Sequence, residues 1–193
     1  MEWRYWGHAE RMNLTELPTQ VGIGPVAVGG NPLMDEDTID FVISAWLEDG
    51  QWQVTRLPRR TGISVAALTE ALSAQPSEGS VIGFLAVSED FFVIVRMDGA
   101  KPRFLLSDVS AAEDWSIAAD ILDGLELPMP EDDELDELTP AGHLTLLADL
   151  GMSGSEFAIL AEDLDLYPDE VLTTVAGRLG FGEQFESLLD PPR

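Results

Sequence analysis

Three apolar segments in the middle of the chain constrain the fold most strongly. They read SVIGFLAV at 80–87, FFVIVRM at 91–97 and RFLLSDV at 103–109, and the polar turns SED and DGAKP separate them. Strands joined by such short turns run antiparallel, because a parallel connection needs a crossover of a dozen or more residues. These strands are apolar on nearly every position, which is typical of the middle of a sheet covered on both faces. The chain is therefore expected to contain a buried three-stranded meander.

A hairpin and a helix precede this meander, and a second helix follows it. The stretch from Ile39 to Leu47 alternates apolar and other residues, EDG at 48–50 predicts a turn, and QWQVTRL at 51–57 predicts the returning strand. Ser64 is a candidate cap for a helix whose apolar face is Val65, Leu68, Ala71 and Leu72. Ser110 and Glu113 have capping-box spacing before Ile117, Ala118, Ile121, Leu122 and Leu125. Residues 38–126 are thus predicted to form an α+β domain of order ββαβββα, with a mostly antiparallel five-stranded sheet.

The pattern changes after residue 126. Residues 127–141 combine prolines with the acidic run EDDELDE, which self-repels and predicts a linker. Residues 142–190 then show helical periodicity and predict a small all-helical unit, with Ser153 and Glu156 as a second capping box. Within LYPDEVLTTVAGRLGFGEQF at 166–185, Pro168 suits a first helical position and Gly180 a helix end. Phe181 and Phe185 are predicted to anchor the final helix to its neighbours.

Residues 1–37 show no sustained period and include the Gly/Pro-rich passage GIGPVAVGGNP. They are predicted to be a flexible N-terminal tail or extension. Regular patterning begins directly after Met34, so this methionine is an alternative start of the protein.

Composition excludes several functions. The 36 acidic and 10 basic residues give a net charge of −26, which opposes direct binding to nucleic acid and to anionic membranes. The apolar runs are far shorter than the roughly 18 residues of a membrane span, and the N-terminus has no secretory pattern, so a cytoplasmic protein is predicted. The absence of cysteine excludes disulfides, thiolate catalysis and cysteine-ligated metals.

No catalytic, cofactor or metal-binding residue is predicted. His8 and Glu10 match half of the zinc-deaminase signature H-x-E, but the other half requires cysteines. His143 is interpreted as a capping or exposed residue. The acidic run at 163–170 fails as an EF-hand, because Pro168 stands where the loop requires glycine. The tryptophans Trp46, Trp52 and Trp115 are interpreted as core or hairpin residues.

Several motifs carry a family resemblance over about residues 39–190. They are FVISAWLEDGQWQV, QPSEG, FFVIVR, LLSDVSAAEDW with AADIL, the acidic linker, LLADLGMS, and above all DLDLYPDEVL with RLGFGEQFE. In these motifs the chain resembles a family of actinobacterial tRNA adenosine deaminase-associated proteins. The resemblance implies association with the enzyme that converts adenosine to inosine in tRNA, and it transfers no catalytic residue.

The sequence and the resemblance leave three hypotheses about function. The first is a non-enzymatic accessory protein that docks on the deaminase through its acids. The predicted contact residues are Asp132, Asp133, Glu134, Asp136, Glu137, Asp163, Asp165, Tyr167, Asp169 and Glu170. The second is a small-ligand binder or enzyme with a pocket near Ser107, Asp108, Asp114 and Trp115. The third is an acidic soluble protein unrelated to the deaminase in mechanism.

Overall fold

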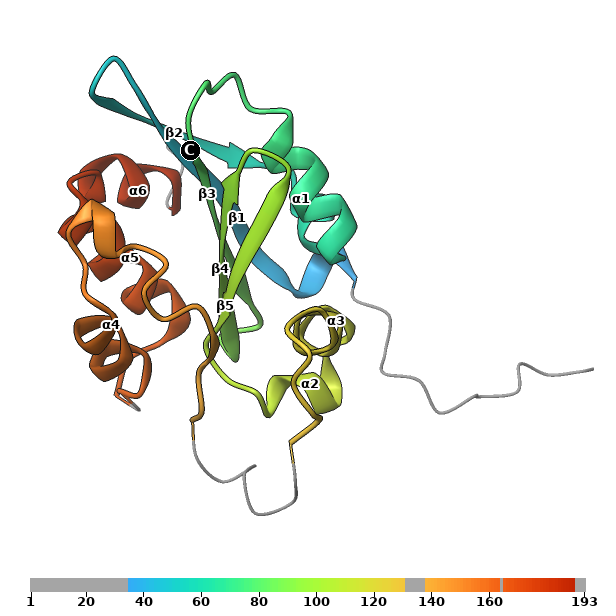
Figure 1. Cartoon of the computed structure of the whole chain (residues 1–193). Coiled ribbons are helices and arrows are strands. Elements are labelled where there is room, and N and C mark those ends of the chain that lie inside the picture. The colour runs from blue at the N-terminus through green and yellow to red at the C-terminus, as the bar shows by residue number, and fades with distance from the viewer. Residues whose placement is uncertain (1–34, 131–137, 164, 190–193) are drawn as a thin grey trace, which may run out of the picture. The chain divides into compact units, whose positions relative to one another are not determined.

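The computed structural model describes residues 35–130, 138–163 and 165–189. Its centre is an antiparallel sheet with the strand order β2-β1-β3-β4-β5-β6 (Figure 1). The strands are β1 Ile39–Glu48, β2 Gln51–Leu57, β3 Val81–Val87, β4 Phe91–Asp98, β5 Lys101–Leu106 and β6 Ala141–Gly142. The predicted α+β class and the antiparallel sheet are confirmed. The order ββαβββα up to residue 126 is also confirmed, except that the last helix is divided in two.

The sheet has one strand more than the five predicted. The additional strand, β6, pairs Gly142 with Leu105 and Ala141 with Leu106. It lies where the acidic linker was predicted to meet the helical unit. Two residues carry no detectable alternation, so only the pairing with β5 identifies them as a strand.

Helices α1 Val65–Ser73, α2 Ala111–Asp114 and α3 Ser116–Gly124 cover one face of the sheet (Figure 1). Ser64 caps α1 as predicted, because its hydroxyl accepts the Ala67 N–H at 3.2 Å. Gly83 allows α1 to approach the sheet, since a Cβ there would lie 2.6 Å from the Leu72 side chain. These contacts place the apolar face of α1 directly on the central strands.

The helix predicted after Ser110 is divided in two. Trp115 has extended backbone angles, with φ −120° and ψ 117°, and separates α2 from α3. Ser110 was wrong as a cap, because it makes no side-chain cap bond. Its N–H and hydroxyl are both donated to the Asp108 carboxylate instead. The Asp108 carboxylate therefore holds Ser110 in place directly before α2.

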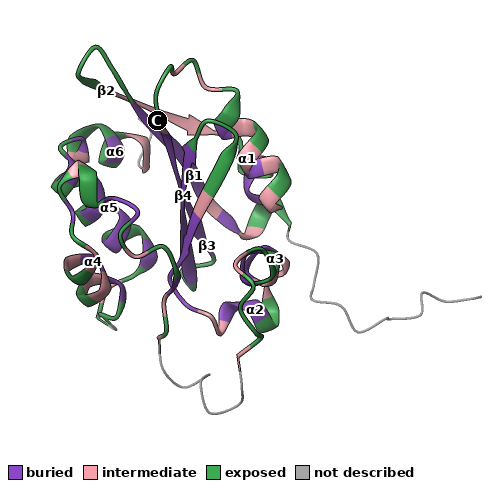
Figure 2. Cartoon of the chain, viewed as in Figure 1, coloured by how far each residue is buried: buried purple, intermediate pink, exposed green. Residues whose placement is uncertain are grey.

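Helices α4 Gly154–Ala161, α5 Pro168–Leu179 and α6 Gly182–Leu189 cover the opposite face. Figure 2 shows buried residues along the central strands, between the two helical layers. This second core contains Phe41 and Phe84 from the sheet together with Phe181 and Phe185 from the C-terminal segment. The C-terminal helices and the sheet thus share one apolar cluster. The division of the chain into an α+β domain at 38–126, a linker at 127–141 and a helical unit at 142–190 stays a prediction.

Aromatic rings hold α6 to the sheet. Phe185 is fully buried, and its ring packs edge-on against Phe41 and Phe84, with centroid distances of 5.7 and 5.5 Å. The ring of Phe181 lies 4.6 Å from that of Trp52, whose indole N–H donates to the Leu179 carbonyl at 2.9 Å. Trp52 on β2 therefore fixes the end of α5 as well as the start of α6.

Gly180 makes the sharp change of direction between α5 and α6. Its φ of 96° is left-handed, and its N–H donates to the carbonyls of Ala176 and Gly177. A glycine adopts this conformation without the steric cost that a Cβ would bring. The chain can therefore turn from α5 into α6 while Phe181 enters the core.

Within the described ranges, no helix is both long and apolar enough to cross a membrane. His8, Glu10 and Met34 lie outside these ranges, so the interpretation of residues 1–37 as a tail stays a prediction.

Candidate functional site

The predicted contact residues form two groups along the chain. Asp132, Asp133, Glu134, Asp136 and Glu137 lie outside the described residues. Asp163, Asp165, Tyr167, Asp169 and Glu170 lie between α4 and α5 and on the first turn of α5, and all five are exposed. We call this second group the α4–α5 surface.

Hydrogen bonds between backbone N–H groups and acidic side chains order the α4–α5 surface. The Asp163 carboxylate accepts the Asp165 N–H at 3.0 Å, and the Glu170 carboxylate accepts the Tyr167 N–H at 3.0 Å. Glu170 thereby caps α5, and its negative charge sits at the positive end of the helix dipole. The same acids that carry the surface charge therefore also define the shape of the turn.

Two exposed apolar side chains accompany these acids. Tyr167 is 59% exposed and Ile159 on α4 is 75% exposed, the largest exposed fraction among the large apolar side chains in the described ranges. Sequence reasoning assigned no role to Ile159. The sequence did contain a signal for its exposure, because Ile159 lies off the helical face formed by Phe157, Leu160 and Ala161. An isoleucine outside the buried stripe of its helix is a candidate contact residue for a partner.

An ion pair connects the two helices that carry this surface. Arg178 in the last turn of α5 donates to the Glu156 carboxylate of α4 at 2.7 Å. This hydrogen bond holds the pKa of Glu156 below its usual value. Ser153 caps α4 through the Glu156 N–H at 3.3 Å. Glu156 thus joins the start of α4 to the end of α5.

Three of the four residues named for a pocket in the α+β part have side-chain hydrogen bonds within the fold. The Ser107 hydroxyl accepts the Phe92 N–H at 2.9 Å, and the Asp108 carboxylate accepts the N–H groups of Ser110 and Thr139. Trp115 donates its indole N–H to Asp90 at 2.7 Å. Ser107 lines a cavity of about 30 Å³ that Asp108, Asp114 and Trp115 do not share. The cavity at Ser107 therefore contains one of these four residues.

Candidate metal ligands are dispersed over the described residues. No group of three or more His, Asp or Glu side chains there is placed to hold a metal ion. His143 follows β6 rather than starting a helix, and it is exposed. Its N–H donates to the Phe104 carbonyl at 2.8 Å, so this residue extends the pairing of the sheet edge.

Together, the fold and the surface define an acidic α+β protein with a helix-covered antiparallel sheet and a charged turn at the start of α5. The chain belongs to the family of Rv3753c-like tRNA adenosine deaminase-associated proteins, whose model matches residues 40–182. It is 36% identical to Protein Rv3753c of Mycobacterium tuberculosis (strain ATCC 25618 / H37Rv) over 156 residues. This match covers 80% of the chain and 90% of the relative. No solved structure matches the chain.

Proposed function

We propose that the chain is a non-catalytic accessory or regulatory protein that binds the tRNA adenosine deaminase by direct protein contact. The family description supports an association with this enzyme. The observation that carries the contact mechanism is the exposed α4–α5 surface, where four exposed acidic residues flank the exposed Tyr167 along the chain.

Charge favours the deaminase, rather than tRNA, as the direct partner. An enzyme that binds tRNA presents lysine and arginine to the phosphate backbone, and these side chains attract an acidic protein. The same net charge of −26 opposes contact between this chain and tRNA itself. The protein would then occupy the tRNA-binding surface and compete with tRNA, in the cytoplasm where we place both proteins.

Tyr167 and Ile159 would supply the apolar part of the contact. Interface energy concentrates in a few desolvated side chains, and tyrosine is frequent among them, whereas exposed charges mainly steer the encounter. The acids should therefore control the association rate, and the apolar residues the dissociation rate. Asp132, Asp133, Glu134, Asp136 and Glu137 would extend the negative field toward the same partner.

Interferometry with both purified proteins tests this proposal. We compare the wild-type chain with a variant in which Asp163, Asp165, Asp169 and Glu170 become amides, since amides keep the hydrogen-bond acceptors of the turn. A matched control neutralises the exposed acids Glu113, Asp114, Asp120 and Asp123, which lie on the helices of the opposite face. A third variant neutralises the five linker acids.

Binding that weakens with salt, with slower association in the α4–α5 variant than in the control, would support the proposal. Charges are screened within about 8 Å at physiological ionic strength, so the difference should shrink as salt rises. No binding at low salt would reject the contact mechanism. Equal effects of the α4–α5 variant and its control would reject this surface, and a ternary complex with tRNA would reject the competition.

A further inference from the structure

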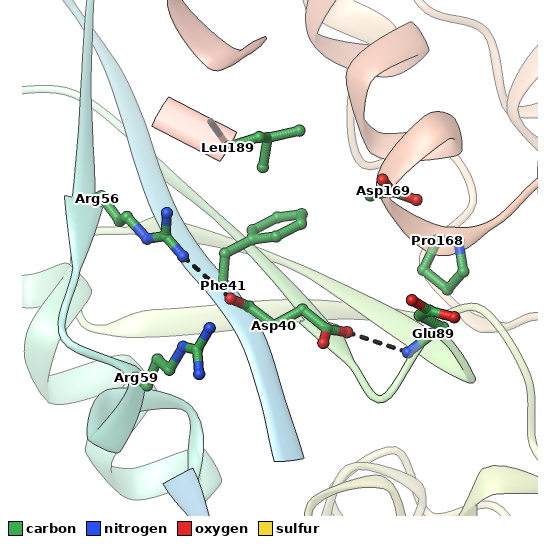
Figure 3. A pocket seen from close by; sticks show the side chains of 8 residues that line it. All are labelled: Asp40, Phe41, Arg56, Arg59, Glu89, Pro168, Asp169 and Leu189. Atoms are coloured by element: carbon green, nitrogen blue, oxygen red, sulfur yellow. Dashed lines mark hydrogen bonds between the residues drawn. The ribbon is translucent and has the colours of Figure 1, made fainter. Parts of the chain in front are cut away.

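A pocket with opposite charges on its two sides lies between the sheet and the ends of α5 and α6. Its cavity measures about 250 Å³. It is lined by Asp40, Phe41, Arg56, Arg59, Glu89, Pro168, Asp169 and Leu189, and we call it the charged pocket. Figure 3 shows the two arginines on one side and Glu89 and Asp169 on the other, with Phe41 between them.

Backbone hydrogen bonds restrain two of the charged side chains. Arg56 donates to the Leu188 carbonyl at 2.7 Å and to the Asp40 carbonyl at 3.1 Å. The Asp40 carboxylate points away from Arg56 and accepts the Glu89 N–H at 3.0 Å (Figure 3). Glu89 is in the left-handed region, with φ 56°, in the turn between β3 and β4. This turn therefore holds Asp40 toward the acidic side of the pocket.

The opposite charges remain separate across the cavity. Within the described part of the chain, Arg56 and Arg59 form no ion pair with Asp40, Glu89 or Asp169. Each charged side of the pocket can therefore bind the opposite charge of a ligand. A purely anionic ligand would meet three carboxylates, and a purely cationic ligand would meet two guanidinium groups.

A ligand that carries both a negative and a positive charge can pair with both sides of the pocket. The buried side chains of Phe41 and Pro168 and the half-buried Leu189 offer apolar contact between the charged sides. The cavity is smaller than the roughly 300–1,000 Å³ of drug-sized sites, so it suits a small metabolite. We propose that the charged pocket binds a small ω-amino acid, with the carboxylate toward Arg56 and Arg59, the ammonium toward Glu89 and Asp169, and the methylene chain over Phe41.

Titration of 6-aminohexanoate into the ¹⁵N-labelled full chain, followed by NMR, tests this site without any deaminase. We expect saturable shifts in the amide signals of Phe41, Glu89 and Asp169, with a Kd of about 1 mM or lower. Hexanoate and hexylamine each lack one of the two charges, and each should bind at least about ten-fold more weakly. 4-Aminobutanoate and 8-aminooctanoate test whether another spacing of the charges fits better.

Two variants and one control assign the binding to this pocket. Arg59→Gln and Asp169→Asn should each weaken binding about ten-fold, because each removes one charge of the pair. Arg60→Gln removes the neighbouring exposed arginine, which does not line the cavity, and should leave binding unchanged. Absence of saturable shifts with all three amino acids would overturn the proposal. So would equal binding of hexylamine and 6-aminohexanoate, since that result indicates general attraction of cations to an acidic protein.

Discussion

Arg96 on β4 and Asp149, 53 positions later in the chain, form two parallel hydrogen bonds of 2.5 and 2.7 Å. Arg96 is only 7% exposed, and it also donates to the Leu146 carbonyl at 2.9 Å. Asp98 lies on its other side, with 3.3 Å between the Arg96 Nε and a carboxylate oxygen. This buried arginine thereby ties the segment that follows β6 to the middle of the sheet.

Replacing Asp149 should destabilise the fold. Asp149→Ala leaves the Arg96 guanidinium buried with fewer acceptors, and a lost hydrogen bond to a charged group costs about 1.5–3 kcal/mol. Because the Asp149 side chain is 61% exposed, water compensates in part and the lower end is expected. Urea unfolding measures the change. Asp120→Ala, at an exposed position on α3, is the control and should stay within about 0.5 kcal/mol of wild type.

The same pair predicts a pH dependence. The hydrogen bonds from Arg96 hold the pKa of Asp149 below its usual value. A depressed pKa in the folded state contributes stability that is present above the unfolded-state pKa and lost as the pH falls through the folded-state pKa. The stability difference between wild type and Asp149→Asn should therefore be greatest above about pH 5 and shrink toward about pH 2. A constant difference across this range in urea unfolding would contradict the assignment.

Phe185 should be a main determinant of stability in the second core. Its side chain is fully buried between α6 and the sheet, so Phe185→Ala creates a cavity and should cost about 3–5 kcal/mol in the free energy of unfolding. Ile159→Ala is the matched control, because this apolar residue is 75% exposed and should change stability by less than about 0.5 kcal/mol. An unchanged unfolding curve for Phe185→Ala would show that α6 does not pack on the sheet as described.

Residues 1–34 should be dispensable for folding. The first described contact of the folded part is made by Asp35, whose carboxylate accepts the Asp37 N–H, and Thr38 accepts the Ser88 N–H at 2.9 Å. A chain that starts at Asp35 keeps both contacts. Its melting temperature, measured by circular dichroism, should equal that of the full chain. A fall of several degrees would show that the N-terminal residues stabilise the fold.

Local chemistry explains which elements could be predicted. Ser64, Pro168 and Gly180 act on their own helix ends, so their effects follow from residues within a few positions. The meander was predictable because three apolar strands and two short turns are adjacent in the sequence. Ser110 shows where this reasoning fails. Its spacing to Glu113 fits a capping box, but the nearby Asp108 carboxylate competes for the Ser110 N–H and hydroxyl.

The candidate sites also differ in whether their residues are close together or far apart in the sequence. The acids at 163–170 are close together in the sequence, so their common surface could be predicted from the sequence. The charged pocket could not, because Asp40, Arg56 and Asp169 come from distant parts of the chain. The hydrogen-bond partners of Ser107 and Asp108 could not be predicted for the same reason. The backbone groups of Phe92 and Thr139, remote in sequence, take up the polar atoms of these two side chains.

Sequence patterns and composition were sufficient to predict the α+β class, the antiparallel meander, the helix-forming segments and the excess of negative charge. Periodicity, turn residues and composition act locally or additively, so they need no knowledge of tertiary contacts. Long-range contacts were needed to show that β6 joins the sheet, that α4, α5 and α6 cover its second face, and that Arg96 pairs with Asp149. These features depend on the shape and hydrogen-bonding complementarity of residues far apart in the chain, which no local pattern encodes.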